Sequence, residues 1–175
     1  MKKFFAMIFA LAILLSAAKQ AAAEALEENV IRIDLEQRKL TLSKGGKEVA
    51  EFPIAIPRHA LKNLPWEGEA IGAEKNPSWH PTKNIKEYYL EKKGIELPDH
   101  LAPGDPRNAM GKGKILIHFT NLNVTDPIRI HGTNDEASIG QKVTRGCIRL
   151  RNSDILRLIN LIKDEPTRII ILKAA

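Results

Sequence analysis

Several short runs of the chain alternate apolar and polar residues, which is the pattern of half-buried β-strands. In residues 30–35, Arg32 and Asp34 alternate with apolar neighbours. Further strands are predicted at residues 38–42, 49–56, 114–119, 127–131, 147–150 and 168–172. Gly45 and Gly46 separate the second run from the third and indicate a turn, so we expect a hairpin or meander at the start of the domain.

Two short helices are predicted. The first, at residues 84–93, gathers its larger apolar side chains on one side: Ile85, Tyr89 and Leu90. The second runs to residue 163 after candidate N-cap residues at 152–154. Its apolar residues recur at helical spacing: Ile155, Leu158, Ile159 and Ile162. About eight short strands with two helices indicate a mainly β fold, a single-domain sandwich or barrel of short mixed strands.

The stretch from residue 57 to residue 113 is rich in proline and glycine, which interrupt any long regular element. Apart from the helix at 84–93, we predict no long strand or helix there. Because an irregular stretch of this length within a compact domain is usually functional, we interpret it as an inserted lid or cleft wall.

Residues 1–23 have the pattern of a secretory signal peptide. Two lysines precede an uncharged, mostly apolar run at 4–18, and three alanines at 21–23 suit a signal peptidase. The run of 15 residues is shorter than the roughly 20 that a membrane-spanning helix needs, which disfavours the alternative of an uncleaved anchor. We expect cleavage after Ala23, export of residues 24–175, and membrane contact only through the segment before cleavage.

Charge and composition exclude several classes of protein. Three of the 27 basic residues and none of the 21 acidic residues lie in residues 1–23, which leaves 24 basic residues and a net charge of +3. This charge is too weak to indicate nucleic acid binding. A hydrophobic content of 43% excludes disorder, and a single cysteine excludes a disulfide scaffold. Cys147 is therefore a reactive thiol, a site of intermolecular pairing or a small buried hydrophobe.

The neighbours of Cys147 favour the reactive thiol. His131 ends one predicted strand, and Cys147 begins another 16 residues later, so their side chains can face each other. A histidine within hydrogen-bonding reach can take the thiol proton when substrate arrives, or hold a thiolate–imidazolium pair beforehand. Arg145 and Arg149 flank the sulfur and favour the thiolate. Gly146 lets backbone N–H groups approach a developing oxyanion.

These residues also resemble a known signature. The segments IHGT at 130–133 and TRGCIRL at 144–150 resemble that of the L,D-transpeptidase catalytic domain family (YkuD type). Upstream, PSWHPT at 77–82 and DPRNAMG at 105–111 resemble the W-x-P-T and N-P-x-G segments of the family, with Ala109 in place of the usual proline. The resemblance covers essentially all of residues 24–175, which we expect to be one catalytic domain.

The resemblance implies a role for each matching residue. Cys147 would be the nucleophile, His131 its base, and Gly132 the residue whose carbonyl orients the imidazole. Backbone N–H groups around Gly146 would form the oxyanion hole, together with those of Arg145 and Cys147. The candidates for substrate contact are Thr144, Arg145, Arg149, His118 and Trp79. Many members of the family have Ser-His-Gly-Cys where this chain has TRGC at 144–147, which leaves His131 as the base.

Three residues have a structural alternative to a role in the site. His118 alternates with apolar neighbours, so it lines a face near the site or packs structurally. Trp66 and Trp79 either floor a peptide or glycan cleft or belong to the core.

The implied activity is a two-step acyl transfer on peptidoglycan stem peptides in the periplasm or cell envelope. Cys147 would attack the carbonyl of the third stem residue and expel D-alanine. An amine would then resolve the thioester, from a neighbouring stem for a 3→3 crosslink or from a lysine of an envelope lipoprotein. Water as acceptor would make the protein an L,D-carboxypeptidase. The resemblance implies no cofactor and no metal. It also implies that carbapenems acylate the Cys147 thiol.

Three other functions compete with this hypothesis. His118, His131 and Cys147 are types of residue that bind zinc, but their spacing matches no short ligand motif. A non-catalytic envelope-binding domain would not need both the thiol and the imidazole. A papain-like hydrolase would have its histidine after the cysteine, whereas here the histidine comes first.

Overall fold

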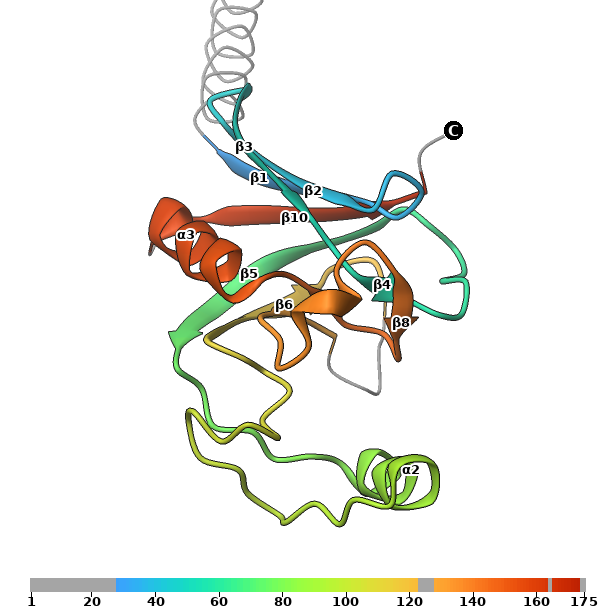
Figure 1. Ribbon diagram of the computed structural model, residues 1–175. Helices are drawn as coiled ribbons and strands as arrows, with labels where there is room; N and C mark the ends of the chain where they lie inside the picture. The colour runs from blue at the N-terminus through green and yellow to red at the C-terminus, as the bar shows by residue number, and fades with distance from the viewer. Residues whose placement is uncertain (1–27, 123–127, 164, 174–175) are drawn as a thin grey trace, which may run out of the picture.

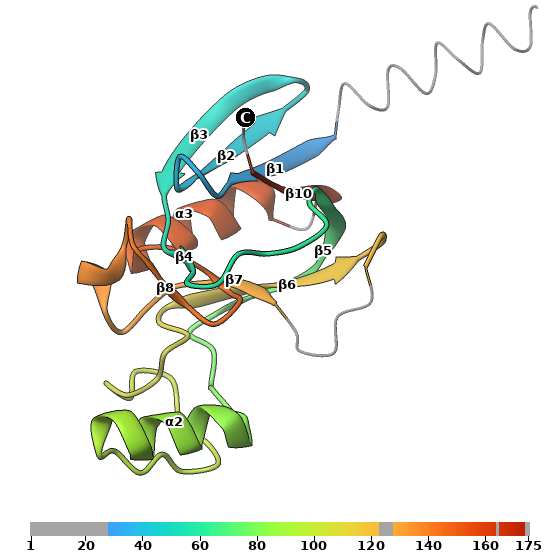
Figure 2. The same ribbon diagram turned by 90° about the vertical axis from the view of Figure 1, so that its right-hand side faces the viewer.

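The computed structural model describes residues 28–122, 128–163 and 165–173, so the predicted signal peptide lies outside the described residues. One curled, mixed sheet dominates the fold (Figures 1 and 2), with strand order β3-β2-β1-β10-β5-β6-β7-β9. Its strands are β1 (Asn29–Asp34), β2 (Lys39–Lys44), β3 (Lys47–Pro53), β5 (Trp66–Lys75), β6 (Gly113–Phe119), β7 (Arg129–His131), β9 (Ile148–Arg149) and β10 (Thr167–Leu172). Strands β4 (Ile56–Pro57) and β8 (Lys142–Thr144) form a small second sheet.

The α-helices of the described residues are α2 (Lys83–Lys93) and α3 (Asn152–Ile162), with a 3₁₀ turn at Glu136–Ser138. The prediction of a mainly β fold with mixed strands and two short helices is confirmed. The sheet is an open half-barrel, because β3 and β9 form its two edges. No helix among the described residues is long and apolar enough to span a membrane.

Strands β1, β2 and β3 form the predicted antiparallel meander. Gly45 and Gly46 make the turn between β2 and β3 with φ of 55° and 73°, as a type I′ hairpin turn requires. Strand β10 pairs in parallel with β1 and antiparallel with β5. The last strand of the chain therefore lies inside the sheet, where Ile169 and Ile171 are fully buried.

Strand β5 contradicts the prediction that residues 57–113 contain no long strand. It spans ten residues and pairs with both β10 and β6. A Cβ at Gly68 would lie 2.4 Å from the backbone oxygen of His118, so a glycine is required inside this strand. A bulge after Ala70 then breaks the alternation and leaves Ile71 63% exposed. Both features remove the pattern by which a strand is predicted.

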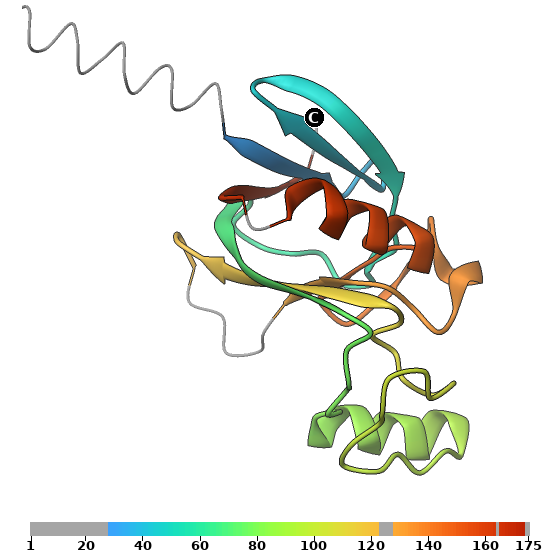
Figure 3. The same ribbon diagram turned by 90° about the vertical axis from the view of Figure 1, so that its left-hand side faces the viewer.

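Helix α3 packs against β5 and β6 (Figure 3). The residues that it buries are those predicted: Ile155, Leu158, Ile159 and Ile162. The predicted N-cap at 152–154 is wrong, because the N-cap residue is Arg151 and its side chain makes no capping hydrogen bond. Instead, Glu136 Oε1 accepts a hydrogen bond from the backbone N–H of Asn152 at 3.0 Å. The Asn152 side chain is thus available for other contacts.

The insertion between β5 and β6 carries α2 away from the sheet (Figures 1 and 2). Helix α2 is where the sequence predicts it, but none of its residues is buried and Leu90 is 57% exposed. Two backbone hydrogen bonds of 2.9 and 2.8 Å between Trp79 and Leu101 join the outgoing and returning segments of the insertion.

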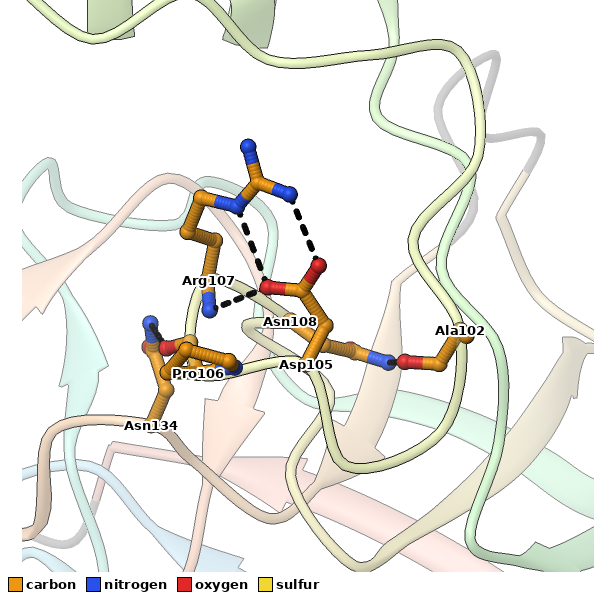
Figure 4. A network of polar contacts seen from close by, with 6 residues as sticks. All are labelled: Ala102, Asp105, Pro106, Arg107, Asn108 and Asn134. Atoms are coloured by element: carbon orange, nitrogen blue, oxygen red, sulfur yellow. Dashed lines mark hydrogen bonds and ion pairs between the residues drawn. The ribbon is translucent and has the colours of Figure 1, made fainter.

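Polar contacts fix the returning segment next to the sheet (Figure 4). The Asp105 carboxylate accepts hydrogen bonds from the backbone and side chain of Arg107 at 2.8–3.1 Å. Asn108 is buried, and its Nδ2 donates to two backbone carbonyls at 2.9 and 3.1 Å. Asn134 Nδ2, from the loop after β7, donates to the carbonyl of Pro106 at 3.1 Å. The insertion is therefore tied to the loop that follows His131.

Candidate active site

Strands β7 and β9 place His131 and Arg149 on one face of the sheet. The strands are parallel, with Ile130 opposite Ile148 and His131 opposite Arg149. Ile130 and Ile148 are fully buried in the core. Because successive side chains of a strand point to opposite faces, His131 and Arg149 point away from that core.

Cys147 reaches the same face. It directly precedes β9, two residues before Arg149, and Arg129 lies two residues before His131. The same alternation therefore brings all four side chains to one side, where they line a cavity of about 870 Å³. Cys147 is partly exposed and forms no disulfide.

The insertion, the segment after β4, the loop after β7 and the turn after β8 form the remaining walls of this cavity. Helix α2 contributes one wall, which agrees with the interpretation of the insertion as a cleft wall. The other lining residues include Arg58, Trp79, Ile85, Tyr88, Tyr89, Lys93, Ala109, Asn134, Asp135, Thr144, Arg145 and Gly146.

His131 is held in one orientation and is 3% exposed. Its Nδ1 lies 2.7 Å from the carbonyl oxygen of Gly132, the contact expected for that glycine. Because a carbonyl only accepts, Nδ1 carries the proton and Nε2 is unprotonated. Burial and then the charge of Arg149 lower the pKa of His131 to about 3, opposed in part by the backbone carbonyls of Gly132 and Ala109. The imidazole is therefore neutral at pH 7.

Asn152 fixes the loop that carries the Gly132 carbonyl. Its Oδ1 accepts from the backbone N–H groups of Lys112 and Thr133 at 2.8 and 3.2 Å. Its Nδ2 donates to the carbonyl of Thr133 at 2.8 Å. A Cβ at Gly132 would lie 2.5 Å from the same Oδ1, so only glycine allows this approach. Asn152 thus positions the His131 loop against the end of the insertion.

The turn that carries Cys147 is closed by Thr144. The Thr144 side chain is buried, and its Oγ1 donates to the carbonyl of Cys147 at 2.6 Å. Gly146 lines the cavity between Arg145 and Cys147, with φ of 156°. The structure thus gives Thr144, a candidate for substrate contact, a role in shaping the turn.

Among the described residues, one nitrogen of the Arg149 guanidinium is hydrogen-bonded to the protein, and another is not. Its Nη1 donates to Ser138 Oγ at 3.1 Å. Its Nε is buried and has no hydrogen-bond partner within the described part of the chain. A buried donor of this kind is costly unless a ligand or water satisfies it, which agrees with the predicted contact with substrate.

The remaining candidates divide between the cavity and other places. Arg145 and Trp79 line the cavity, and Trp79 packs edge-to-face on Tyr89 at 6.2 Å. Trp66 belongs to the core, 5.6 Å from Phe119. His118 is exposed on β6, opposite Glu69, and does not line the cavity.

The ligands of the zinc hypothesis are not brought together. Among residues 28–122, 128–163 and 165–173, no three His, Cys, Asp or Glu side chains are grouped to hold a metal ion. His118 is separated from the cavity that His131 and Cys147 share.

Several residues of the site were not predicted from the sequence, among them Arg58, Tyr88, Arg129 and Asn152. Arg129 could have been found, because it lies two residues before His131 in a predicted strand. Arg58 and Tyr88 have no such signal, because Arg58 directly follows β4, Tyr88 lies on α2, and no local pattern places these two elements beside one cavity.

The fold and the cavity define a class of protein. It is a mainly β half-barrel in which a thiol directly before one strand and a neutral imidazole on the neighbouring parallel strand share one cavity, as cysteine-dependent acyl transfer requires. The chain belongs to the YkuD L,D-transpeptidase catalytic domain family, whose model matches residues 28–171.

Individual proteins similar to this chain agree with the family assignment. The chain is 38% identical over 114 residues to a probable L,D-transpeptidase of Escherichia coli (strain K12), ErfK/SrfK, covering 64% of this chain and 34% of the relative. It is 33% identical over 140 residues to the probable L,D-transpeptidase YcfS of the same organism, covering 78% and 42%. The chain thus spans less than half the length of these curated relatives.

A solved structure supports the fold. L,D-transpeptidase 3 from Mycobacterium tuberculosis, in complex with a faropenem-derived adduct, matches with a TM-score of 0.56 at 15% identity. The match covers 83% of this chain and 60% of that chain.

Proposed function

We propose that this protein is an L,D-transpeptidase that acts on peptidoglycan stem peptides, with a cysteine nucleophile and no metal or organic cofactor. The observation that carries this proposal is the position of Cys147 and His131, which reach one cavity from the start of β9 and the end of its parallel neighbour β7. The match of the family model to residues 28–171 supports it.

In the first step, Cys147 Sγ attacks the carbonyl of the third stem residue while His131 Nε2 takes the thiol proton. Because burial lowers its pKa to about 3, the imidazole is neutral before substrate arrives and is free to accept this proton. Backbone N–H groups at Arg145, Gly146 and Cys147 are the donors proposed for the oxyanion. Collapse of the tetrahedral intermediate breaks the amide bond, His131 returns the proton to the leaving nitrogen, and D-alanine departs from the thioester.

In the second step, an amine attacks the thioester, loses a proton to His131 and releases the Cys147 thiol. The amine of a neighbouring stem gives a 3→3 crosslink, and a lysine of an envelope lipoprotein gives protein attachment. Water in the same position gives an L,D-carboxypeptidase, which is the second candidate function.

The proposed location is the periplasm or cell envelope, reached after cleavage of residues 1–23. We further propose that carbapenems acylate Cys147. The structurally similar L,D-transpeptidase 3 from M. tuberculosis is in complex with a faropenem-derived adduct. This supports the proposal, because faropenem and the carbapenems are both β-lactams that acylate nucleophiles.

The test is incubation of the purified protein with disaccharide tetrapeptides, followed by mass spectrometry of the products. Crosslinked dimers establish the transpeptidase, and tripeptides alone establish the carboxypeptidase. Cys147→Ala should abolish both products. His118→Asn is the matched control and should retain them, because His118 lies outside the cavity. Turnover by Cys147→Ala, or no product from the wild-type protein, would contradict the proposal.

A further inference from the structure

The cavity is strongly cationic although the chain as a whole is not. Five of its lining residues are basic, and one lining residue, Asp135, carries a carboxylate. The basic residues are Arg58, Lys93, Arg129, Arg145 and Arg149. A cleft lined by one sign of charge favours a ligand of the opposite sign.

Two of these cations are held against the same aromatic ring. The guanidinium carbons of Arg145 and Arg58 lie 4.1 and 5.6 Å from the centroid of Tyr88, which comes from α2. Arg145 Nη1 donates to the carbonyl of Asn84 at 3.0 Å, and Arg58 Nη2 donates to the carbonyl of Val143 at 3.1 Å. Each guanidinium has five N–H donors, so both retain donors for a ligand.

No carboxylate neutralises this pair in the described part of the chain. None of the ion pairs there includes Arg58 or Arg145. The hydrogen bond from Arg58 and the nearby cationic charges lower the pKa of Tyr88, although burial opposes the shift. Two like charges on one ring repel each other, and an anion bound between them would remove that repulsion.

The pair is also close to the reacting atoms. Arg145 lies two residues before Cys147, which limits their Cα atoms to at most about 7 Å apart. Both residues also line the same cavity, so a ligand group held by Arg145 belongs to a peptide that is bound at Cys147.

We propose that Arg58, Tyr88 and Arg145 form a subsite that binds a free carboxylate of the donor stem peptide. The proposal rests on the proposed function, and it defines the substrate class as stems in which this carboxylate is not amidated. Two groups of a donor stem have this chemistry: the side-chain carboxylate of a diaminopimelate third residue, and the carboxylate of the terminal D-alanine.

The experiment measures the rate of acyl-enzyme formation on Cys147 by intact mass spectrometry. Three tetrapeptide stems are compared: diaminopimelate with both carboxylates free, the same stem amidated on the third residue, and the same stem with a terminal alaninamide. The proteins are the wild type, Arg58→Gln, Tyr88→Leu and the matched control Arg32→Gln, whose arginine is exposed on β1. Each rate is normalised to iodoacetamide alkylation of Cys147 in the same protein, so that a general loss of thiol reactivity is removed.

The wild type and Arg32→Gln should prefer the free stem over one of the two amidated stems by about tenfold, as expected for a charge-assisted hydrogen bond. Arg58→Gln should remove most of that preference by slowing the stems that retain the bound carboxylate, with the change in KM rather than kcat. The stem in which this carboxylate is amidated should react at the same rate as with the wild type. The amidated stem that reacts more slowly with the wild type identifies which carboxylate the subsite binds. Tyr88→Leu should reduce the preference, because it removes the surface on which both guanidinium groups are held.

Three results would overturn the subsite. The wild type could react equally with all three stems, Arg58→Gln could slow all stems by the same factor, or the variants could affect only the later transfer to an amine. In each case an acyl-enzyme still forms, so the proposed function stands. If no stem acylates the wild type, the proposed function fails and the subsite fails with it.

Discussion

Burial of the neutral His131 imidazole makes the stability of the folded protein depend on pH. Its pKa is about 3 in the folded chain and about 6.5 in an unfolded chain. The unfolded state therefore binds the proton first, and stability falls as pH decreases from about 6.5 toward 3. The linkage relation gives a loss of about 2 kcal/mol from this residue between pH 7 and pH 5.

The perturbation that isolates this contribution is His131→Asn, in which an amide can still donate to the Gly132 carbonyl. Urea unfolding of the wild type and the variant at several pH values between 7 and 5 gives the free energy of unfolding for each. The variant should be less stable at pH 7, and its stability should fall by about 2 kcal/mol less than that of the wild type. All other titrating groups are common to both proteins and cancel in the difference.

His118→Asn is the matched control, because His118 is exposed on β6. Its stability should follow the wild-type pH dependence. Parallel pH profiles for wild type and His131→Asn would refute the argument, because they would mean that the imidazole titrates in the folded chain as it does in the unfolded chain.

Two further predictions concern the framework of the site. Asn152→Ala removes three hydrogen bonds to Lys112 and Thr133 and should lower the free energy of urea unfolding by about 2–4 kcal/mol. The matched control Asn160→Ala removes one exposed contact with Lys75 and should lower it by less than about 1 kcal/mol. An equal effect of the two would contradict the role of Asn152 in fixing the His131 loop. Ile148→Ala removes most of a fully buried side chain next to Cys147 and should lower the free energy of unfolding by about 2–5 kcal/mol in the same assay. Ile71→Ala changes a side chain that is 63% exposed and should lower it by under about 1 kcal/mol. A small effect of Ile148→Ala would mean that β9 does not pack on the core as the structure shows.

The sequence predicted the parts of the structure that depend on local alternation. The meander, the strand that ends at His131 and the helix with Ile155 follow from periodicity within single segments. Alternation also extends to the site, since side chains two residues apart share a face. The shared face of Cys147 and Arg149 could therefore be predicted without knowledge of the full topology.

Other parts depend on contacts that no local pattern contains. Strand β5 was missed because Gly68 meets a neighbouring backbone and the bulge after Ala70 breaks the alternation. Asn152 is of a residue type that favours N-caps, but it is the first residue of α3, and its side chain binds two backbone segments from distant parts of the chain. Arg58 and Tyr88 meet only because the insertion returns α2 to the cavity.

The central claim is that the Cys147 sulfur becomes acylated by the stem peptide. The direct measurement is mass spectrometry of the protein quenched in acid during turnover of a tetrapeptide stem, with peptide mapping of the modified residue. A tripeptide thioester on Cys147 in the wild type, and no adduct on Cys147→Ala folded to the same stability, is the predicted result. A wild-type protein that turns over the stem while Cys147 stays unmodified, or an equal adduct on Cys147→Ala, would contradict the claim.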